Sequence, residues 1–208
     1  MDAPLNKSAQ AQVARQSAIS AHLGGLTGFT AAPPLVFIRT LIRLRIDYRL
    51  SMSVPSLPYR SRAVRALVLL HEQHLRRFLQ TWRLAQATAV VLPATQDPAY
   101  TSLDALGRHV LGAARGYMVW MCEMLKLPDP GIRPAPDAAV LSEEAESYME
   151  HVLERWRAPL QDVSDERLET PEYRSRWETL YSIDAMLEHA VMHPIRHAFQ
   201  LEELMRPR

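Results

Sequence analysis

Four stretches of the chain repeat apolar side chains at every third or fourth position, the spacing of an amphipathic helix. Prolines separate these stretches, which cover about residues 60–88, 101–126, 138–163 and 174–206. Ser102 or Thr101 is a suitable N-cap for the second stretch. No convincing strand lies among the four, and each apolar stripe can be buried only against the others. The pattern therefore predicts an all-α four-helix bundle over residues 59–208.

Residues 1–58 do not continue this pattern, and we expect them to form a basic N-terminal extension and linker. Within them, "LVFIRTLIRLRIDYRL" (35–50) begins with helical spacing, but residues 42–50 alternate like a strand. One short helix is favoured because an isolated strand has no sheet to join. Its arginines suit a nucleic acid or an anionic membrane, or they stay solvated while the apolar side covers the bundle or a second subunit. We favour the latter, and expect a homodimer without a nucleic-acid partner.

Charge is unevenly distributed along the chain, although the net charge is only +1. Residues 1–70 carry nine lysines and arginines against two acids, whereas residues 137–188 carry 14 acids against five arginines. Such surfaces either attract each other or are unrelated solvated faces.

No apolar run reaches the roughly 18 residues of a membrane span. The single cysteine, Cys122, excludes an internal disulfide and is interpreted as a packing residue, which fits a reducing cytoplasm.

Histidines near the C-terminus give the strongest chemical signal. The stretch "EHAVMHPIRHAFQ" places His189, His193 and His197 four residues apart, so a helix would turn them to one side. Neighbouring members, about 6 Å apart along the helix, can share one ion at bonds of about 2.0–2.1 Å. The outer pair, about 12 Å apart, cannot share it. At most two of the three are therefore ligands, and another helix must supply the third.

His109 is the best candidate for that third ligand, because it lies on or beside the apolar face of the second stretch. Small neighbours would let another helix come close to it: Gly107, Gly112, Ala113 and Gly116. Alternatively, a lone histidine on an apolar stripe is a hydrogen-bonded core residue, and histidine pairs also occur on exposed helix faces.

In "HEQH", we expect His71 on the surface and His74 in the core; the spacing is not that of the H-E-x-x-H motif.

Two sequence stretches together resemble the DinB/YfiT-like family: "LDALGRHVLGAARGYMVW" and "HAVMHPIRHAFQ". Its members are four-helix bundles of this size, regarded as metalloenzymes, with one ligand from the second helix and two from a terminal H-x3-H. The resemblance covers about residues 60–206 and implies His109, His193 and His197 as the metal ligands.

The chain departs from the family pattern in two places. Ala198 and Phe199 replace the usual Arg-Gly after the last histidine, although Gln200 is kept. Pro194 stands between the two implied ligands, and a proline inside a helix predicts a kink there.

Three neutral imidazoles would leave a divalent ion its full charge and an open position, as in catalytic sites. Such an ion acidifies bound water and polarises carbonyls. The ligand set admits Zn, Ni or Fe, and the resemblance adds a low-molecular-weight thiol. We therefore predict a metal-dependent enzyme that acts on a small-molecule substrate by hydrolysis or thiol-dependent transfer. His189 is the first candidate for its general acid or base. The alternative is a non-catalytic metal- or ligand-binding stress-response protein of the same family.

Overall fold

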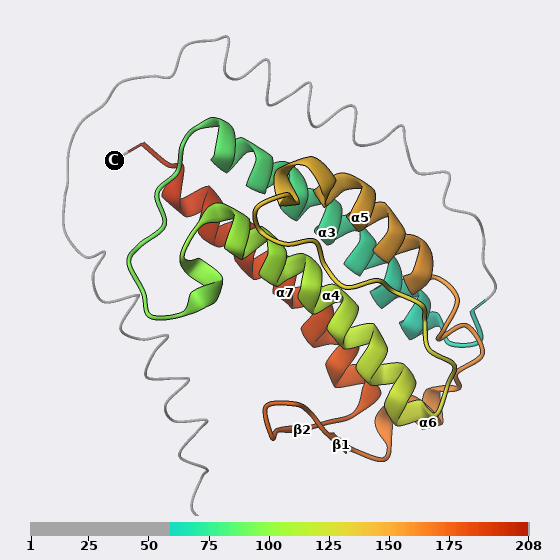
Figure 1. Ribbon diagram of the computed structural model, residues 1–208. Helices are drawn as coiled ribbons and strands as arrows, with labels where there is room; N and C mark the ends of the chain where they lie inside the picture. Colours follow the sequence, from blue (N-terminus) through green and yellow to red (C-terminus); the bar gives the residue numbers. More distant parts are fainter. Residues whose placement is uncertain (1–58, 208) are drawn as a thin grey trace, which may run out of the picture. The chain divides into compact units, whose positions relative to one another are not determined.

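The computed structural model describes residues 59–207, which form a mostly helical unit (Figure 1). The elements, in chain order, are α3 (Arg62–Ala87), the 3-10 helix η2 (Pro98–Tyr100), α4 (Leu103–Leu125), α5 (Leu141–Trp156), α6 (Asp165–Glu169), β1 (Tyr173–Arg174), β2 (Leu180–Tyr181) and α7 (Ile183–Leu204). The predicted all-α character is confirmed for this part of the chain. The extension and short helix predicted for residues 1–58 lie outside the described residues.

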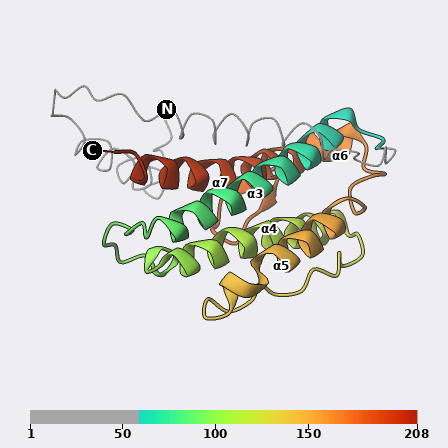
Figure 2. The same ribbon diagram turned by 90° about the horizontal axis from the view of Figure 1, so that it is seen from above.

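Four long helices make up most of this unit. Helix α3 runs along α7, and α4 contacts both α5 and α7 (Figures 1 and 2). Large apolar side chains from all of them fill the space between, including Phe78, Met118, Leu153 and Leu201. Within residues 59–207, no helix combines the length and apolarity that crossing a membrane requires.

Serine caps begin three of the four long helices. Ser61 Oγ accepts a hydrogen bond from the Val64 backbone N–H at the start of α3. Ser102 does the same for α4, as one of the two predicted caps, and Ser182 caps α7. Each cap satisfies a backbone donor that has no partner within its own helix. These caps set where α4 and α7 begin, and so the turn on which each histidine lies.

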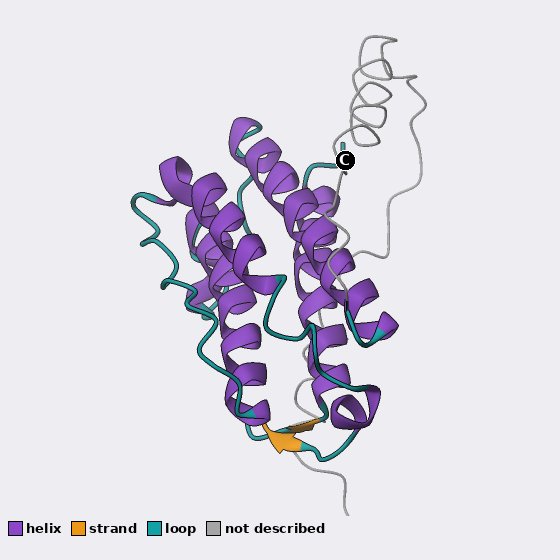
Figure 3. Ribbon diagram, turned by 90° about the vertical axis from the view of Figure 1, so that its right-hand side faces the viewer, coloured by secondary structure: helices purple, strands orange, loops and turns teal. Residues whose placement is uncertain are grey.

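The predicted ends of two helices are wrong. The third stretch is helical only to Trp156, and the fourth begins at Ile183 rather than near residue 174. Between them lies a short antiparallel hairpin in which Tyr173 pairs with Tyr181 (Figure 3). The cap at Ser182 starts α7 late, and the Trp120 indole N–H donates to the carbonyl of Arg174 at 3.2 Å, which ties the hairpin to α4.

The expectations for the two histidines of "HEQH" are also wrong. His71 is only 1% exposed, and its ring stacks on Trp156 with centroids 3.7 Å apart. His74 is only partly buried. Helix α3 packs against α7 on one side and α5 on another, so it buries more than the single stripe that the sequence pattern indicated. Leu70, an apolar residue of the same predicted helix, remains 39% exposed.

Close approach of α4 to its neighbours depends on one of the predicted small residues. A Cβ atom on Gly107 would lie 2.8 Å from both Leu141 Cδ2 and Trp82 Cε2. The Trp82 indole N–H donates to the carbonyl of Leu103 at 2.6 Å and holds that ring in place. Gly116, by contrast, faces open space. The glycine therefore sets how closely the first turns of α4, including His109, approach the core.

Candidate metal centre

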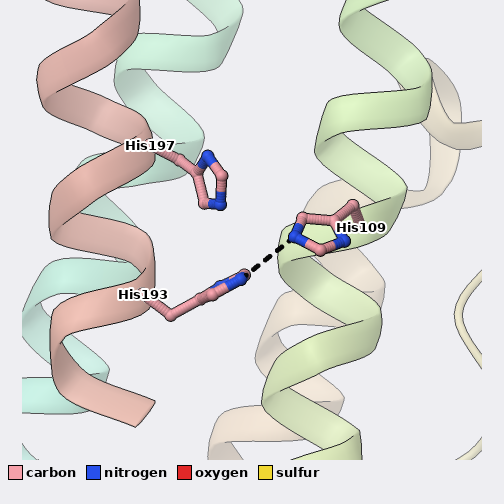
Figure 4. A group of neighbouring side chains, drawn as sticks. All are labelled: His109, His193 and His197. Carbon is pink, nitrogen blue, oxygen red and sulfur yellow. Dashed lines mark hydrogen bonds between the residues drawn. The ribbon is translucent and has the colours of Figure 1, made fainter. Parts of the chain in front are cut away.

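Three histidines converge between α4 and α7. His109 comes from α4, and His193 and His197 come from successive turns of α7 (Figure 4). One ring nitrogen from each lies within 4.8 Å of those of the other two. The Nε2 atoms of His109 and His193 are 3.0 Å apart. The structure therefore brings together the residues that the sequence singled out, although 84 positions separate the first two.

These separations fit a single bound ion. Three nitrogens at about 2.0–2.1 Å from a tetrahedral ion lie about 3.3 Å from one another. The observed nitrogens are all within 4.8 Å, so small side-chain rotations would bring them to that spacing. Imidazole donors of this number suit Zn, Ni or Fe. The three-histidine cluster could therefore hold a divalent metal ion.

A contact with Gln200 indicates which nitrogen of His197 carries the proton. Its Nδ1 lies 3.0 Å from the amide oxygen Oε1 of Gln200. An amide oxygen only accepts hydrogen bonds, so Nδ1 carries the hydrogen and Nε2 keeps its lone pair. That Nε2 is buried and has no hydrogen-bond partner. Tyr100 places its hydroxyl 3.5 Å from the same Nδ1 and adds a second polar neighbour.

His193 is also incompletely satisfied by protein groups. Its Nε2 faces His109, and its buried Nδ1 has no partner. Buried polar atoms without partners are rare in folded proteins, because each costs about 1–3 kcal/mol of desolvation. A bound ion would explain the unsatisfied Nε2 of His197, whereas the Nδ1 of His193 stays without a partner because Nε2 is the atom that faces the cluster.

Burial keeps the cluster uncharged at neutral pH. Burial, followed by the charge of Arg196, lowers the pKa of His197 to about 3. Burial is the main reason that the pKa of His193 lies far below its usual range, and the neighbouring histidines and Arg196 lower it further. The pKa of His109 is lowered mainly by burial as well. Neutral imidazoles have a free lone pair, which is the form that binds a metal.

His189 lies one turn before the triad and outside it. It is half-buried, and its ring centroid is 6.5 Å from that of His193. Aromatic rings surround it: Tyr117 at 5.4 Å, Trp177 at 5.6 Å and Tyr181 at 5.7 Å. Burial, followed by the charge of Arg196, lowers its pKa, so it is a neutral base at physiological pH.

Other residues of α4 and α7 have clear positions. Glu123 is exposed, whereas Tyr117 is buried with its ring centroid 5.7 Å from that of His193. Cys122 is only 1% exposed, and burial raises the pKa of its thiol to about 11. Its packing interpretation is confirmed. Pro194 is buried inside α7, which continues as one helix through it.

Sequence reasoning missed Tyr100, Trp177 and Arg196. Tyr100 belongs to η2, and its ring centroid is 5.8 Å from that of His197 and 6.5 Å from that of His109. The signal that could have found it is "DPAYTS", a capped turn directly before α4. Trp177 was assigned to a helix, and Arg196 shares the turn between two histidines. The proximity of Tyr100 and Trp177 to the triad depends on contacts between distant segments, whereas Arg196 adjoins His197 in the chain.

The fold and the cluster together describe a mostly helical protein with three histidines that could hold a metal ion. Comparisons do not narrow this class. No family model matches the chain, and neither curated proteins nor solved structures yield a significant match.

Proposed function

We propose that this protein is a divalent-metal-dependent enzyme that acts on a small molecule by hydrolysis or thiol-dependent transfer. The buried Nε2 of His197 carries the proposal. Its lone pair is set by the hydrogen bond from Nδ1–H to Gln200, and no protein donor satisfies it. An oriented, unsatisfied imidazole nitrogen beside two others is the arrangement that metal ligands require.

We further propose that the chain is a DinB/YfiT-like four-helix bundle. The order of the ligands supports this, with one histidine from α4 and two from the terminal helix α7. The side-by-side packing of four long helices also supports it. The resemblance rests on these residues and their arrangement alone. A homodimer stays a prediction, and light scattering of the purified protein tests it.

A divalent ion on three neutral imidazoles would supply Lewis acidity toward water, a carbonyl or a thiol. The surrounding residues would orient a ligand, transfer a proton and exclude water. Gln200 orients the ring of His197 through Nδ1. His189, neutral and one turn from His193, accepts a proton at a ring nitrogen and returns it to the leaving group. Tyr100 and Tyr117 border the triad and limit the access of bulk water.

Metal content tests the first half of the proposal. Protein purified without a histidine tag should contain one divalent ion per chain by elemental mass spectrometry. His109→Ala should lose it, because two ligands from one helix remain. His74→Ala is the matched control, since His74 lies on α3 outside the triad, and it should keep the ion. Wild-type protein without a stoichiometric ion would overturn the proposal.

Catalysis requires a separate test. The metal-loaded protein is screened for hydrolysis of small esters and amides and for transfer reactions, with and without a low-molecular-weight thiol. His189→Gln should lower kcat and leave metal content unchanged, because His189 is not in the triad. A protein that holds its metal but turns over nothing in either screen would favour a non-catalytic metal- or ligand-binding protein instead.

A further inference from the structure

Arg196 is a cation beside the triad without an ion-pair partner among residues 59–207. It lies three residues after His193 in α7, about 60° around the helix axis from it, and its side chain is exposed. Two other arginines are paired at the C-terminal end of α7: Arg77 contacts Glu202, and Arg206 contacts Glu203. The guanidinium of Arg196 is therefore available to a ligand.

The charge of Arg196 acts on groups from three elements. After burial, it contributes to lowering the pKa of His189 on its own helix. Burial raises the pKa of Tyr117 on α4 and of Tyr100 on η2, and the charge of Arg196 lowers both by a smaller amount. Asp97 is an acid that acts on Tyr100, and one of its oxygens already accepts the backbone N–H of Ala99. Arg196 is thus within electrostatic reach of both sides of the triad.

Trp177 presents an exposed aromatic ring at the other border of the site. It is 46% exposed, whereas Trp82, Trp120 and Trp156 are at most 4% exposed. Its ring centroid lies 5.6 Å from His189 and 6.5 Å from Tyr117.

The turn that carries Trp177 is well defined. The N–H of Ser175 donates to the carbonyl of Thr179 at 2.8 Å, and Ser175 is buried. Glu178 adopts the left-handed backbone conformation with φ of 67°, which closes the turn. The hydrogen bond from Trp120 to Arg174 holds this turn against α4. The turn therefore holds the backbone of Trp177 beside α4, and the ring itself is partly packed and 46% exposed.

We propose that the three-histidine site takes a small molecule with a carboxylate, which Arg196 binds, and a planar apolar group, which lies against Trp177. This inference rests on the proposed function, because the metal would act on an ester, amide or other electrophilic group in the segment that joins the carboxylate to the planar group. A guanidinium presents two parallel N–H donors that match the two oxygens of a carboxylate. Two anchors and the metal would fix the orientation of the substrate, which is a large part of catalysis.

Binding of three simple probes tests the inference on zinc-loaded, full-length protein. Benzoate has both features, benzamide has the ring without the charge, and acetate has the charge without the ring. Calorimetry should show that benzoate binds roughly tenfold more tightly than either of the others. Arg196→Gln should remove the advantage over benzamide. Trp177→Ala should remove the advantage over acetate, and Trp177→Phe should restore most of it.

Two controls match these variants. Arg108→Gln changes an arginine beside His109 whose Nε donates to the carbonyl of Pro136, away from the triad. Leu180→Ala removes an apolar side chain of the same hairpin that is 52% exposed. Both should bind benzoate as the wild type does. Circular dichroism establishes that each variant is folded.

The outcomes separate this inference from the proposed function. If zinc is bound but Arg196→Gln leaves the preference for benzoate over benzamide intact, the carboxylate assignment is wrong. Zinc-loaded protein that binds none of the probes also overturns the inference, while the metal site stands. Protein that fails to retain zinc overturns the proposed function itself, whatever the probes do.

Discussion

Gln200 accepts the Nδ1–H of His197 through its amide oxygen, at 3.0 Å, one helical turn further along α7. The two residues are three positions apart, so the contact follows from helical geometry once both side chains lie on one face. Its effect is chemical as well as geometric. With the proton held at Nδ1, the lone pair of Nε2 remains available inside the cluster.

Replacing Gln200 by Ala should therefore weaken zinc binding by about 10- to 100-fold, because His197 loses its oriented tautomer. Competition with a chelator of known affinity measures this change. Gln200→Glu keeps an acceptor oxygen and should retain most of the affinity. Phe199→Ala, at an adjacent side chain that is 56% exposed, serves as the control. Equal affinities for Gln200→Ala and wild type would show that the hydrogen bond has no part in metal binding.

Zinc affinity should depend only weakly on pH between 7.5 and 6. Protons compete with a metal only below the pKa of each ligand, and burial has moved the pKa of His197 down to about 3 and that of His193 further down. Three histidines with an ordinary pKa of about 6.5 would lose roughly fifty-fold in affinity over this range. We expect less than about fivefold, measured by chelator competition corrected for the protonation of the chelator. A fifty-fold loss would show that the cluster is solvated.

Acid should destabilise the protein through His71. Burial, followed by the charge of His74, lowers its pKa from 6.5 to about 3. The unfolded chain thus binds a proton below pH 6.5 that the folded state excludes. The stabilising contribution is complete above pH 6.5 and is lost, by up to about 1.4 kcal/mol per pH unit, as pH falls toward 3.

His71→Phe can keep the stack on Trp156 and removes this titration. Between pH 7 and pH 5, its free energy of unfolding should fall by about 2 kcal/mol less than that of the wild type. Urea denaturation of both proteins, with a chelator present to exclude metal effects, provides the measurement. Identical pH slopes would mean that His71 is protonated in the folded state.

Two glycines of α4 should respond to alanine with opposite signs. At Gly107, the new methyl group meets Trp82 and Leu141 at 2.8 Å, and overpacking of this kind costs about 1–3 kcal/mol. That exceeds the gain in helix propensity of up to about 1 kcal/mol. At Gly116 nothing lies within 4 Å, so only the gain remains and the variant should be more stable. Thermal unfolding of both variants tests this, and a stabilised Gly107→Ala would mean that α4 can move away from α3.

Much of the helical framework could be predicted because its signals are local. Apolar spacing located the four long helices, and Ser102 caps α4 as one of the two candidates. Helical geometry divided the terminal histidines into a neighbouring pair and a third residue, and it required a partner from another helix. It could not show that His109 faces that pair, because the orientation of α4 against α7 depends on packing along both helices.

The errors share a physical origin in non-local contacts. Residues 173–181 have apolar spacing that a helix could use, but the hydrogen bond from Trp120 to the carbonyl of Arg174 favours a hairpin. His71 lies outside the stripe that the pattern marked, yet α5 covers it through Trp156. In each case a partner distant along the chain outweighed the local preference.

The sequence by itself determined the helical segments, the caps and the four-residue spacing that sets His193 and His197 on one face, since these follow from backbone geometry within a few residues. Only the tertiary structure decided that His109 completes the cluster and that Trp177 borders it. Those relationships depend on how α4, α7 and the hairpin pack. Packing is set by side chains that meet across the core rather than along the chain.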